Sequence, residues 1–366
     1  MPDIEDELDL DERSAVDFVA GLRRGWASTI YPAMIAEAGR TGGASGSLAQ
    51  ATETLRGLAL YPWFSHLERQ QQKMMWRVMG DAVLRRRGSL DQRLRVDGSA
   101  GGTLELDAGL ELPRWYTDTD IHIQPGSFFA DESSAFIYEL GARVVMLRDN
   151  DGYKFHKLFA ETALPALPGA TRVVDVGCGF GKSTQVLVSR YPGAEVVGVD
   201  LSAPNLRLAH RQAEGHGHRI RWRQAASYDT GLASASADVV TGTMVLHEMP
   251  REAIEATLRE AARLLRPGGV IRFLEFWPTG DQLRDATVYE HAERNNEPYF
   301  RDLFATDAPA TLAAAGVPGA RWIPFDERAR GLTPEGRDPR PEWHFPWAVL
   351  AAEKPAAPSE EATRGE

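Results

Sequence analysis

The 366-residue sequence lacks several features that mark secreted and membrane proteins. Its only cysteine is Cys178, so no disulfide bond can form within the chain. The first 13 residues are acidic and carry no apolar segment, and no run of 18 apolar residues occurs. These absences predict a protein without a signal peptide or a membrane-spanning helix, and we expect it in the cytoplasm.

Positive charge is also scarce. The chain has 41 Lys and Arg residues against 52 Asp and Glu residues, which gives a formal net charge of −11 at pH 7. Surfaces that bind nucleic acid are normally basic, and anionic membranes attract clusters of basic residues. We therefore expect neither nucleic acid nor a membrane as a partner. The balance is compatible with a neutral or weakly charged small-molecule substrate.

What the sequence does contain is a dense glycine motif. An apolar run over 173–176 is typical of a buried parallel strand, and 183–189 has the pattern of a helix. Between them stand Gly177, Gly179 and Gly181. A strand, a glycine turn and a helix form a nucleotide site at the carboxyl edge of a sheet, where the ligand approaches the backbone closely.

Three nucleotide ligands compete for such a turn. A phosphate-binding loop of the form G-x-x-x-x-G-K-[ST] would end at Gly181-Lys182-Ser183, but Val176 stands where its first glycine belongs. A dinucleotide fingerprint has the form G-x-G-x-x-G, but Lys182 stands where its third glycine belongs, because the glycines here are spaced G-x-G-x-G. The third ligand is S-adenosylmethionine (SAM). Asp175 precedes the glycines, and Asp200 ends the next apolar run, where a carboxylate can accept both ribose hydroxyls.

The D-x-G-x-G-x-G pattern resembles the class I SAM-dependent methyltransferases, in particular their small-molecule, natural-product branch. The resemblance covers roughly residues 131–355. It extends to Ala237–Val240, to Met244–Glu248 and to the Pro-Gly-Gly turn within Leu265–Gly269. It implies a doubly wound, Rossmann-like α/β fold with a seven-stranded sheet, SAM as the cofactor and S-adenosylhomocysteine as the product.

The resemblance also implies a set of cofactor-binding residues. Asp175 and the glycine turn would surround the methionine part of SAM, Asp200 would bind the ribose, and Leu201 would lie against the adenine. The family often has an Asp-Ala pair after its third strand, where this chain has Ala225-Ala226, so Ser227 or Asp229 would have to contact the adenine instead. The full candidate set is Asp175, Gly177, Cys178, Gly179, Gly181, Asp200, Leu201, Ser227 and Tyr228, with Cys178 filling space beside the cofactor.

The spacing of apolar residues predicts helices over 14–38 and 48–87, the second broken near Pro62, and a hairpin over 91–106. From residue 172 onward strands and helices alternate, which predicts a parallel sheet. We expect a mainly helical N-terminal domain over 1–120 for dimerisation and substrate binding. A SAM-binding domain would follow over 121–355, with disordered tails over 1–13 and 356–366.

Methyl transfer requires alignment of acceptor, methyl group and sulfur, and a hydroxyl or acidic carbon acceptor also benefits from a general base. Candidate catalytic residues follow the fourth and fifth expected strands: His247, Glu248 and Glu275. His247 is the first choice because imidazole titrates near neutral pH, although it could be a packing residue, and Glu275 could instead cap a loop. We see no spacing of metal ligands and expect no metal.

Two segments could contact the acceptor. The stretch 112–129 is rich in aromatic and polar residues and is either a wall of the active site or a packed linker. The segment 281–304 often covers the substrate in the family. Together they supply the candidates His122, Gln124, Tyr289, His291 and Tyr299.

By analogy with natural-product methyltransferases, the N-terminal helices favour a lipophilic or aromatic acceptor, methylated on oxygen or carbon, and a homodimer. The alternative is a protein that binds SAM structurally or electrostatically without transferring a methyl group.

Overall fold

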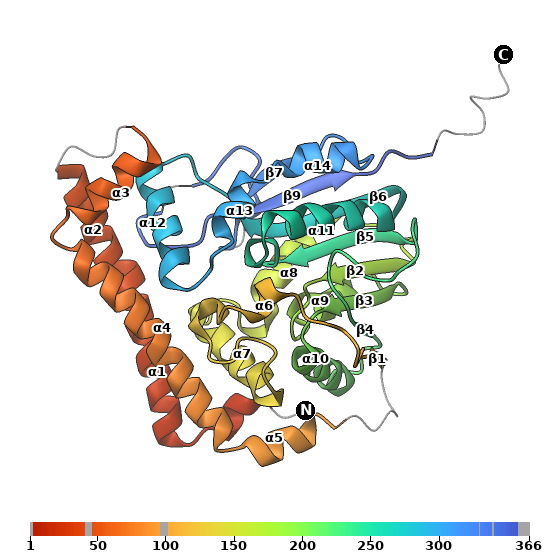
Figure 1. Cartoon of the computed structure of the whole chain (residues 1–366), viewed down its shortest axis with the longest axis horizontal. Helices are drawn as coiled ribbons and strands as arrows, with labels where there is room; N and C mark the ends of the chain where they lie inside the picture. Colours follow the sequence, from red (N-terminus) through yellow and green to blue (C-terminus); the bar gives the residue numbers. More distant parts are fainter. Residues whose placement is uncertain (1–2, 41–45, 96–101, 329, 339, 358–366) are drawn as a thin grey trace.

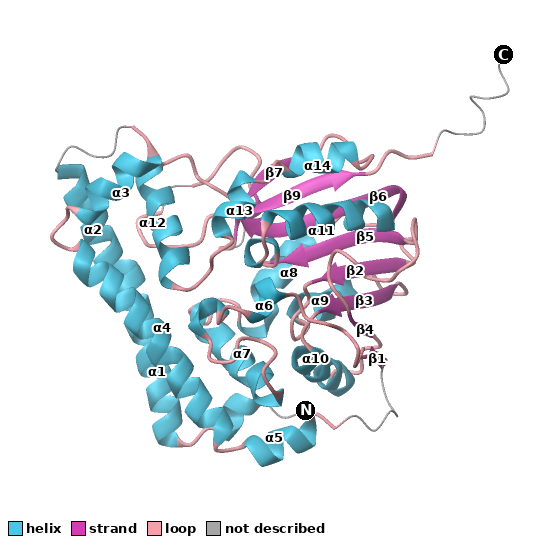
Figure 2. Cartoon of the chain, in the orientation of Figure 1, coloured by secondary structure: helices cyan, strands magenta, loops and turns pink. Residues whose placement is uncertain are grey.

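The computed structural model describes residues 3–40, 46–95, 102–328, 330–338 and 340–357. This part of the chain forms one sheet with the strand order β1-β4-β3-β2-β5-β6-β9-β7-β8 (Figures 1 and 2). Neighbouring strands from β1 to β6 are parallel, and β9, β7 and β8 are joined by antiparallel pairings. The strands are β1 (Thr103–Glu105), β2 (Arg172–Val176), β3 (Glu195–Asp200), β4 (Arg221–Gln224), β5 (Ala237–Thr243), β6 (Leu265–Phe276), β7 (Arg321–Asp326), β8 (Gly331–Leu332) and β9 (Trp347–Glu353).

Nine strands, rather than the seven expected, make up the sheet. The two additional strands are short and extend its edges: β1 pairs with β4, and β8 pairs with β7. The expected hairpin over 91–106 is therefore wrong where the structure describes it, because Arg87–Arg93 is helix α5 and β1 finds its partner in β4. Residues 96–101 of that hairpin lie outside the described residues.

Alternating valines of the central strands face opposite layers of helices, as a doubly wound sheet requires. Val173 of β2 packs in the same cluster as residues of α8 (Lys154–Thr162), α9 (Lys182–Arg190) and α10 (Ala203–Gly215). Val174 packs with residues of α11 (Arg251–Leu264) and α14 (Ala308–Ala314) on the other face. Both valines are fully buried, in agreement with the near-continuous apolar runs of buried parallel strands.

The N-terminal helices form a layer beside the sheet domain, at the left in Figure 1. Long helices α1 (Leu10–Gly25) and α4 (Tyr61–Leu84) pack against α7 (Glu132–Val145), while α3 (Leu48–Arg56) packs against α12 (Gln282–Arg294). A π-helical turn, Trp26–Ile30, joins α1 to α2 (Tyr31–Arg40), and the break near Pro62 is confirmed because α4 begins there. The shorter helices are η1 (Ile4–Glu7), α6 (Arg114–Thr117), η3 (Ile121–Ile123), η4 (Asp151–Tyr153), η5 (Leu246–Glu248) and α13 (Phe300–Ala305).

The start of the described chain is ordered, contrary to the expected disorder over 1–13. Ile4 and Leu8 are buried in the cluster formed by α1, α4 and α7. Glu5 accepts a hydrogen bond from Arg143 Nη1 at 2.8 Å, which ties this segment to α7. Two apolar side chains and an ion pair outweigh the polar composition of the segment.

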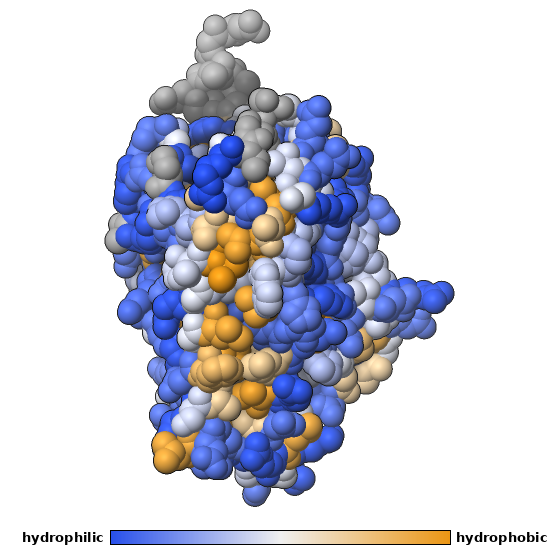
Figure 3. All heavy atoms as spheres, turned by 90° about the vertical axis from the view of Figure 1, so that its left-hand side faces the viewer, coloured by the Kyte–Doolittle hydropathy of each residue, from blue (hydrophilic) through white to orange (hydrophobic). Residues whose placement is uncertain are grey.

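The outer face of the long N-terminal helices carries a band of apolar side chains (Figure 3). Large exposed apolar residues on these helices are Leu10 and Phe18 of α1 and Trp63 and Leu84 of α4. Among the helices of the described residues, none combines the length and apolar character that crossing a bilayer would take.

Candidate functional site

The glycine turn between β2 and α9 is a backbone structure that side chains would obstruct. Gly177 adopts a φ of 65°, a left-handed conformation that L-residues avoid. A Cβ atom at this position would lie 2.1 Å from Cγ2 of Val245. The turn therefore brings its backbone against the end of β5, and only glycine fits at position 177.

Asp175 holds this turn from beneath. Its side chain is fully buried and accepts hydrogen bonds from Ser183 Oγ at 2.6 Å and Thr184 Oγ1 at 2.7 Å, which fix the first turn of α9. Burial raises the pKa of its carboxyl to about 6. Asp175 is absent from the described residues that line the cavity beside the turn, so its geometry suits a positioning residue.

Asp200 ends β3 and does face that cavity. Its Oδ2 accepts the Gly179 N–H at 2.8 Å and its Oδ1 accepts the Ser202 N–H at 2.8 Å. These bonds hold the carboxylate in one orientation, and each oxygen keeps a lone pair for a ligand. Burial raises the pKa of Asp200 to about 6.

One cavity runs from the glycine turn to the N-terminal helices. Its turn-side wall includes Gly177, Cys178, Gly179, Ser183, Asp200, Leu201, Asn205, Ala225 and Ser227. Its far wall is aromatic and polar, and it includes Arg23, Gln72, Trp76, Trp115, Tyr116, His122, Phe128, Tyr138, His247, Glu248, Phe276, His291, Glu297, Phe345 and Trp347.

Lys182, the first residue of α9, is a half-buried cation in the wall of this cavity. The centroid of the Phe180 ring lies 5.0 Å from its Nζ, and the Glu139 carboxylate attracts it from a longer distance. It makes no hydrogen bond or direct ion pair with the residues that the structure describes. Burial lowers the pKa of Lys182 to about 8. An ammonium group that is partly withdrawn from water and has no direct ion-pair partner is unfavourable, and an anionic ligand group would stabilise it.

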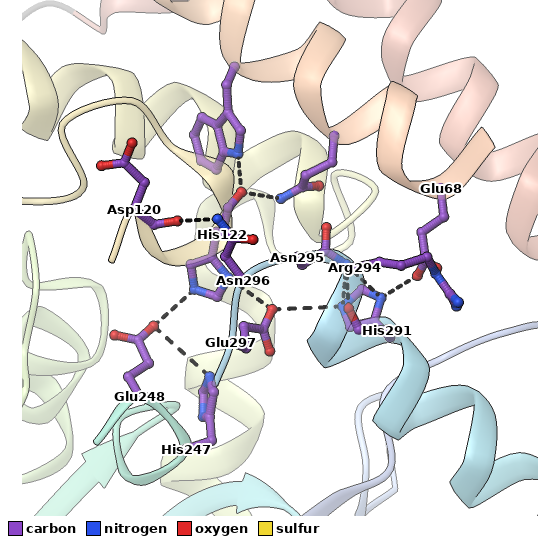
Figure 4. A network of polar contacts seen from close by, with 12 residues as sticks. Glu68, Asp120, His122, His247, Glu248, His291, Arg294, Asn295, Asn296 and Glu297 are labelled. Atoms are coloured by element: carbon purple, nitrogen blue, oxygen red, sulfur yellow. Dashed lines mark hydrogen bonds and ion pairs between the residues drawn. The ribbon is translucent and has the colours of Figure 1, made fainter. Parts of the chain in front are cut away.

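A chain of alternating carboxylates and imidazoles crosses the far end of the cavity, and Figure 4 shows most of it. Its middle is His122, whose Nδ1 lies 3.0 Å from Glu297 Oε1 and whose Nε2 lies 2.9 Å from Glu248 Oε1. Residues from α4, η3, η5, β6, α12 and the segment after α12 contribute to it. In order, the chain is Glu68, His291, Glu297, His122, Glu248, His247 and Glu275.

His122 is held in place by an unusual backbone. His122 and Ile123 have φ angles of 58° and 61°, the left-handed region that β-branched residues such as isoleucine rarely adopt. The His122 carbonyl accepts hydrogen bonds from Trp76 Nε1 at 2.6 Å and Gln72 Nε2 at 3.1 Å. Burial alone would lower the pKa of His122, but Glu297 and Glu248 outweigh it and raise the pKa to about 10.

Glu275 anchors the other histidine. It is fully buried at the end of β6 and accepts the backbone N–H groups of Val245 and Leu246 at 2.5 Å each. Its other oxygen lies 2.8 Å from His247 Nδ1, which leaves Nε2 of His247 directed toward Glu248, 4.0 Å away. Burial opposes protonation of His247, yet the Glu275 carboxylate outweighs it and raises the pKa of His247.

Comparison with known proteins decides the family. Residues 173–269 match the methyltransferase domain. A trans-aconitate 2-methyltransferase from Methylobacterium nodulans is 31% identical over 202 residues, which are 52% of this chain and 69% of that protein. The chain belongs to the class I SAM-dependent methyltransferases. The family resemblance seen in the motifs is thereby confirmed.

Other relatives match over shorter stretches. A trans-aconitate 2-methyltransferase from an Azoarcus species is 44% identical over 162 residues, 43% of this chain and 55% of that protein. A demethylmenaquinone methyltransferase from Thermus thermophilus is 36% identical over 107 residues, 29% of this chain and 48% of that protein. The chain therefore spans about half the length of these two curated relatives.

SAM is the cofactor of this family, and the residues present fit it. The turn at Gly177 has no room for a Cβ atom, the Asp200 carboxylate faces the cavity, and Lys182 offers an unpaired cation there. These three features match the hydroxyl and carboxylate groups of an amino-acid nucleoside. When bound, SAM supplies an electrophilic methyl group on a sulfonium sulfur.

The other cofactor candidates lie in two different settings. Leu201 and Ser227 line the cavity, and Ser227 Oγ lies 2.7 Å from Thr257 Oγ1. Tyr228 is not among the described residues that line the cavity, and it packs with the apolar cluster on the α11 face of the sheet. Cys178 lines the turn, where burial raises the pKa of its thiol well above the usual value, as suits a space-filling side chain.

The acceptor candidates divide in the same way. His122 and His291 line the cavity. Gln124 is fully buried and donates from Nε2 to the Ser134 carbonyl at 3.1 Å, so it braces the loop. Tyr289 and Tyr299 are not among the described lining residues: Tyr289 packs against the Arg301 guanidinium, and Tyr299 donates to the Trp115 carbonyl. On α12, residues 289 and 291 point to different faces, so only His291 turns inward.

Glu68, Glu297, Trp76 and Lys182 were not identified as site residues from the sequence. Glu68 and Trp76 lie within an amphipathic helix, and at helical spacing they read as ordinary helix residues. Glu297 follows α12 in a polar stretch without any motif. Lys182 directly follows Gly181 in the glycine motif. From the sequence we used it only to test the phosphate-loop and dinucleotide patterns and did not consider it as a cofactor ligand.

Proposed function

We propose that the protein transfers the methyl group of SAM to a small, largely apolar aromatic metabolite, at oxygen or carbon. The observation that carries the proposal is the continuity of one cavity. It joins Gly177 and Asp200 at one end to His122, Glu248 and His247 at the other. A cofactor and an acceptor can thus meet inside the protein, away from water, as an in-line displacement requires.

In this proposal each cofactor group has a partner on the chain. Asp200 binds the ribose hydroxyls, Lys182 pairs with the carboxylate of the methionine part, and the adenine lies between Leu201 and Ser227. Asp175 acts indirectly, by holding the turn that carries Gly177. The charge-assisted bonds from Asp200 make it the side chain with the largest expected effect on SAM affinity.

The cavity lining supports an aromatic acceptor. Trp115, Phe128, Tyr138 and Trp347 line its far wall and suit a flat, apolar ring. The relatives named for trans-aconitate act, by their names, on a polycarboxylate, whereas the demethylmenaquinone methyltransferase is named for an apolar aromatic ring system. A polycarboxylate here would meet the carboxylates of Glu248 and Glu297, so the aromatic acceptor is the better fit.

We propose that His247 and Glu248 contact the acceptor and that Glu275 positions His247. This assignment follows from placement: the His247 and Glu248 side chains line the cavity, while Glu275 is fully buried behind them. His122 faces the same space from the opposite side and completes the group that receives the acceptor. Together these side chains can orient an acceptor hydroxyl and stabilise its loss of a proton.

We also propose that residues 1–120 form a domain for substrate binding and dimerisation, and that residues 121–355 form the SAM-binding domain. Arg23, Gln72 and Trp76 from α1 and α4 reach the cavity, which supports the role in substrate binding. The apolar band in Figure 3 supports a homodimer. Sedimentation of the wild type and of a Phe18→Asp variant tests the homodimer; the same monomeric mass for both contradicts it.

The test of the proposed function separates binding from turnover. Calorimetric titration with SAM should give micromolar binding to the wild type. Incubation with SAM and a panel of hydroxylated aromatic compounds should release S-adenosylhomocysteine and give products heavier by one methylene, measured by mass spectrometry. Binding of SAM without release of S-adenosylhomocysteine across oxygen, carbon and nitrogen acceptors would instead identify a protein that uses SAM without methyl transfer.

A further inference from the structure

The acceptor end of the cavity contains a set of metal-ligand atoms that the methyltransferase fold does not explain. One ring nitrogen each of His122 and His247 and one carboxylate oxygen of Glu248 lie within 4.8 Å of one another. Glu248 Oε1 is 2.9 Å from His122 Nε2 and 4.0 Å from His247 Nε2. Bonds of about 2.0–2.2 Å to a bound ion would bring such ligands roughly 3–4 Å apart, so small side-chain rotations would complete the site.

The outer nitrogen of each histidine is already held by a carboxylate. His122 Nδ1 lies 3.0 Å from Glu297, and His247 Nδ1 lies 2.8 Å from Glu275. Carboxylate–histidine pairs of this kind orient metal-binding imidazoles in proteins and make them stronger ligands. Both rings therefore present Nε2 to the same point, beside Glu248 (Figure 4).

The backbone supports the same geometry. Two successive left-handed residues, His122 and Ile123, are strained, and such strain persists only where the surroundings impose it. Here Trp76 and Gln72 impose it by holding the His122 carbonyl. In this conformation the His122 ring places Nε2 at 2.9 Å from Glu248 Oε1.

The charge of the group also favours a cation. Three carboxylates, those of Glu248, Glu275 and Glu297, surround two imidazoles. The group stays negative by one charge even when both rings are protonated. Glu297 also lies 3.9 Å from the His291 ring, which links this group to Glu68. A divalent ion could replace the proton between His122 Nε2 and Glu248 Oε1.

We propose that His122, His247 and Glu248 bind one divalent first-row transition-metal ion, with Zn²⁺ as the type. Two imidazoles and one carboxylate form a ligand set of catalytic metal sites, which leave further positions open. We infer that the open position faces the aromatic wall and takes a hydroxyl oxygen of the acceptor. This second statement deepens the proposed function and rests on it.

The chemistry balances without any redox change. The acceptor O–H bond breaks and its proton leaves to water, the methyl carbon bonds to the oxygen, and the C–S bond breaks with its electrons remaining on sulfur. The ion acts as a Lewis acid that favours loss of the hydroxyl proton, and it keeps its oxidation state. His247 is then a ligand, so no side-chain base is needed, and the methylated atom is oxygen.

Metal binding is tested apart from turnover. The full-length protein, freed of any affinity tag and of metal by a chelator, is titrated with Co²⁺ while its visible absorption is recorded. We expect one equivalent to bind with the intensified spectrum of a low-coordinate nitrogen and oxygen site, and Zn²⁺ to displace it. Glu248→Gln, which keeps the shape of the side chain, should weaken binding by more than about 100-fold. Glu297→Gln should weaken it by about 10- to 100-fold, the usual effect of a group that orients a ligand.

The matched control is His156→Asn, because His156 is a buried histidine in the same cavity wall that pairs with Asn150 instead of the cluster. It should leave Co²⁺ affinity unchanged. Circular dichroism checks that each variant is folded; if Glu297→Gln does not fold, the comparison of Glu248→Gln with His156→Asn still tests the site. No binding to the wild type, or equal loss in Glu248→Gln and His156→Asn, overturns the site. The cluster is then an ion-pair network alone.

The two proposals fail in different ways. Full methyl transfer by chelator-treated protein overturns the metal inference while the proposed function stands. Saturable Co²⁺ binding that depends on Glu248, in a protein that releases no S-adenosylhomocysteine with any acceptor, supports the site but overturns the proposed function. Restoration of oxygen methylation by Zn²⁺, Mn²⁺ or Co²⁺ supports both.

Discussion

The two ends of the cavity are built from different parts of the polypeptide. At the cofactor end the backbone of the glycine turn forms part of the surface, beside the charged side chains of Asp200 and Lys182. At the acceptor end ionisable side chains form the surface, and Glu297, His122 and Glu248 lie within hydrogen-bond distance of one another. A site for an invariant ligand can be built into the backbone. A site that must act on a reacting group needs side chains whose charge and proton content can change.

The stability of the two ends should also differ in origin. Removing a side chain from the acceptor end leaves buried charges or donors without partners, which costs several kcal/mol. Changing the cofactor end strains the backbone or removes a ligand contact. Four substitutions measure this difference.

The largest effect is expected at Glu275, which we place behind the acceptor end. Glu275→Ala removes the acceptor for the Val245 and Leu246 N–H groups and for His247, all of them buried. We expect a loss of about 3–5 kcal/mol in the free energy of unfolding, measured by urea denaturation. Glu353→Ala, at the exposed end of β9, is the control. A loss below about 1 kcal/mol in Glu275→Ala would show that the anchor is dispensable.

The second effect concerns the backbone of the cofactor end. In Gly177→Ala the new methyl group would lie 2.1 Å from Val245 Cγ2, and the residue would keep a left-handed φ. Gly179→Ala is matched to it, since its φ is 52° but its Cβ would meet only Tyr138 at 3.6 Å, an ordinary contact. Conformation alone costs about 1–2 kcal/mol in either variant. We expect Gly177→Ala to lose about 2 kcal/mol more, because overpacking adds its own cost. Equal losses would mean that the close approach to β5 is relieved easily.

The sequence predicts the cofactor end of the cavity better than the acceptor end. Gly177, Asp200 and Leu201 belong to contiguous strand–turn segments, so the motif spacing and the family resemblance together made them candidates, and all three line the cavity. The acceptor end is assembled by packing of distant helices. His122 and His247 were candidates, but Glu297 carries no motif that would place it beside His122.

The candidate residues that lie outside the cavity lining show a second limit. Asp175 and Gln124 were expected beside the ligands, yet both are fully buried and outside the described cavity lining. Sequence pattern shows which elements reach the site. It does not show on which side of a turn a polar side chain lies, because that depends on tertiary hydrogen bonds such as those from Ser183 to Asp175. The edge strand β8 was not predicted, since two residues are too few for a periodic pattern, and β1 lies within the expected hairpin but pairs with β4 instead.

The third effect is on affinity and should leave the acceptor end intact. Asp200→Asn keeps the shape of the side chain but removes its charge, which weakens the proposed bonds to the ribose. We expect the dissociation constant for SAM to rise about 10- to 100-fold, since hydrogen bonds to charged groups contribute about 1.5–3 kcal/mol. Calorimetry measures it, with Asp238→Asn at the opposite end of the sheet as control. Unchanged SAM affinity in Asp200→Asn would remove the ribose role.

The smallest effect on stability is expected at Lys182, and its sign is opposite. Burial lowers the pKa of Lys182 to about 8 from an ordinary value of 10.5, so between these values the unfolded chain binds more protons than the folded one. Its contribution to the stability of the folded protein therefore rises with pH through that window, and below about pH 8 the buried charge is fully unfavourable. Lys182→Met, of similar shape and without charge, should stabilise the protein by about 1–3 kcal/mol at pH 7. The gain should shrink toward pH 10.5 in thermal or urea unfolding.

The same substitution should weaken SAM binding, and wild-type affinity for SAM should fall as the pH rises above about 8. If the variant is more stable at pH 7 but binds SAM as tightly as the wild type, Lys182 does not pair with the carboxylate of SAM.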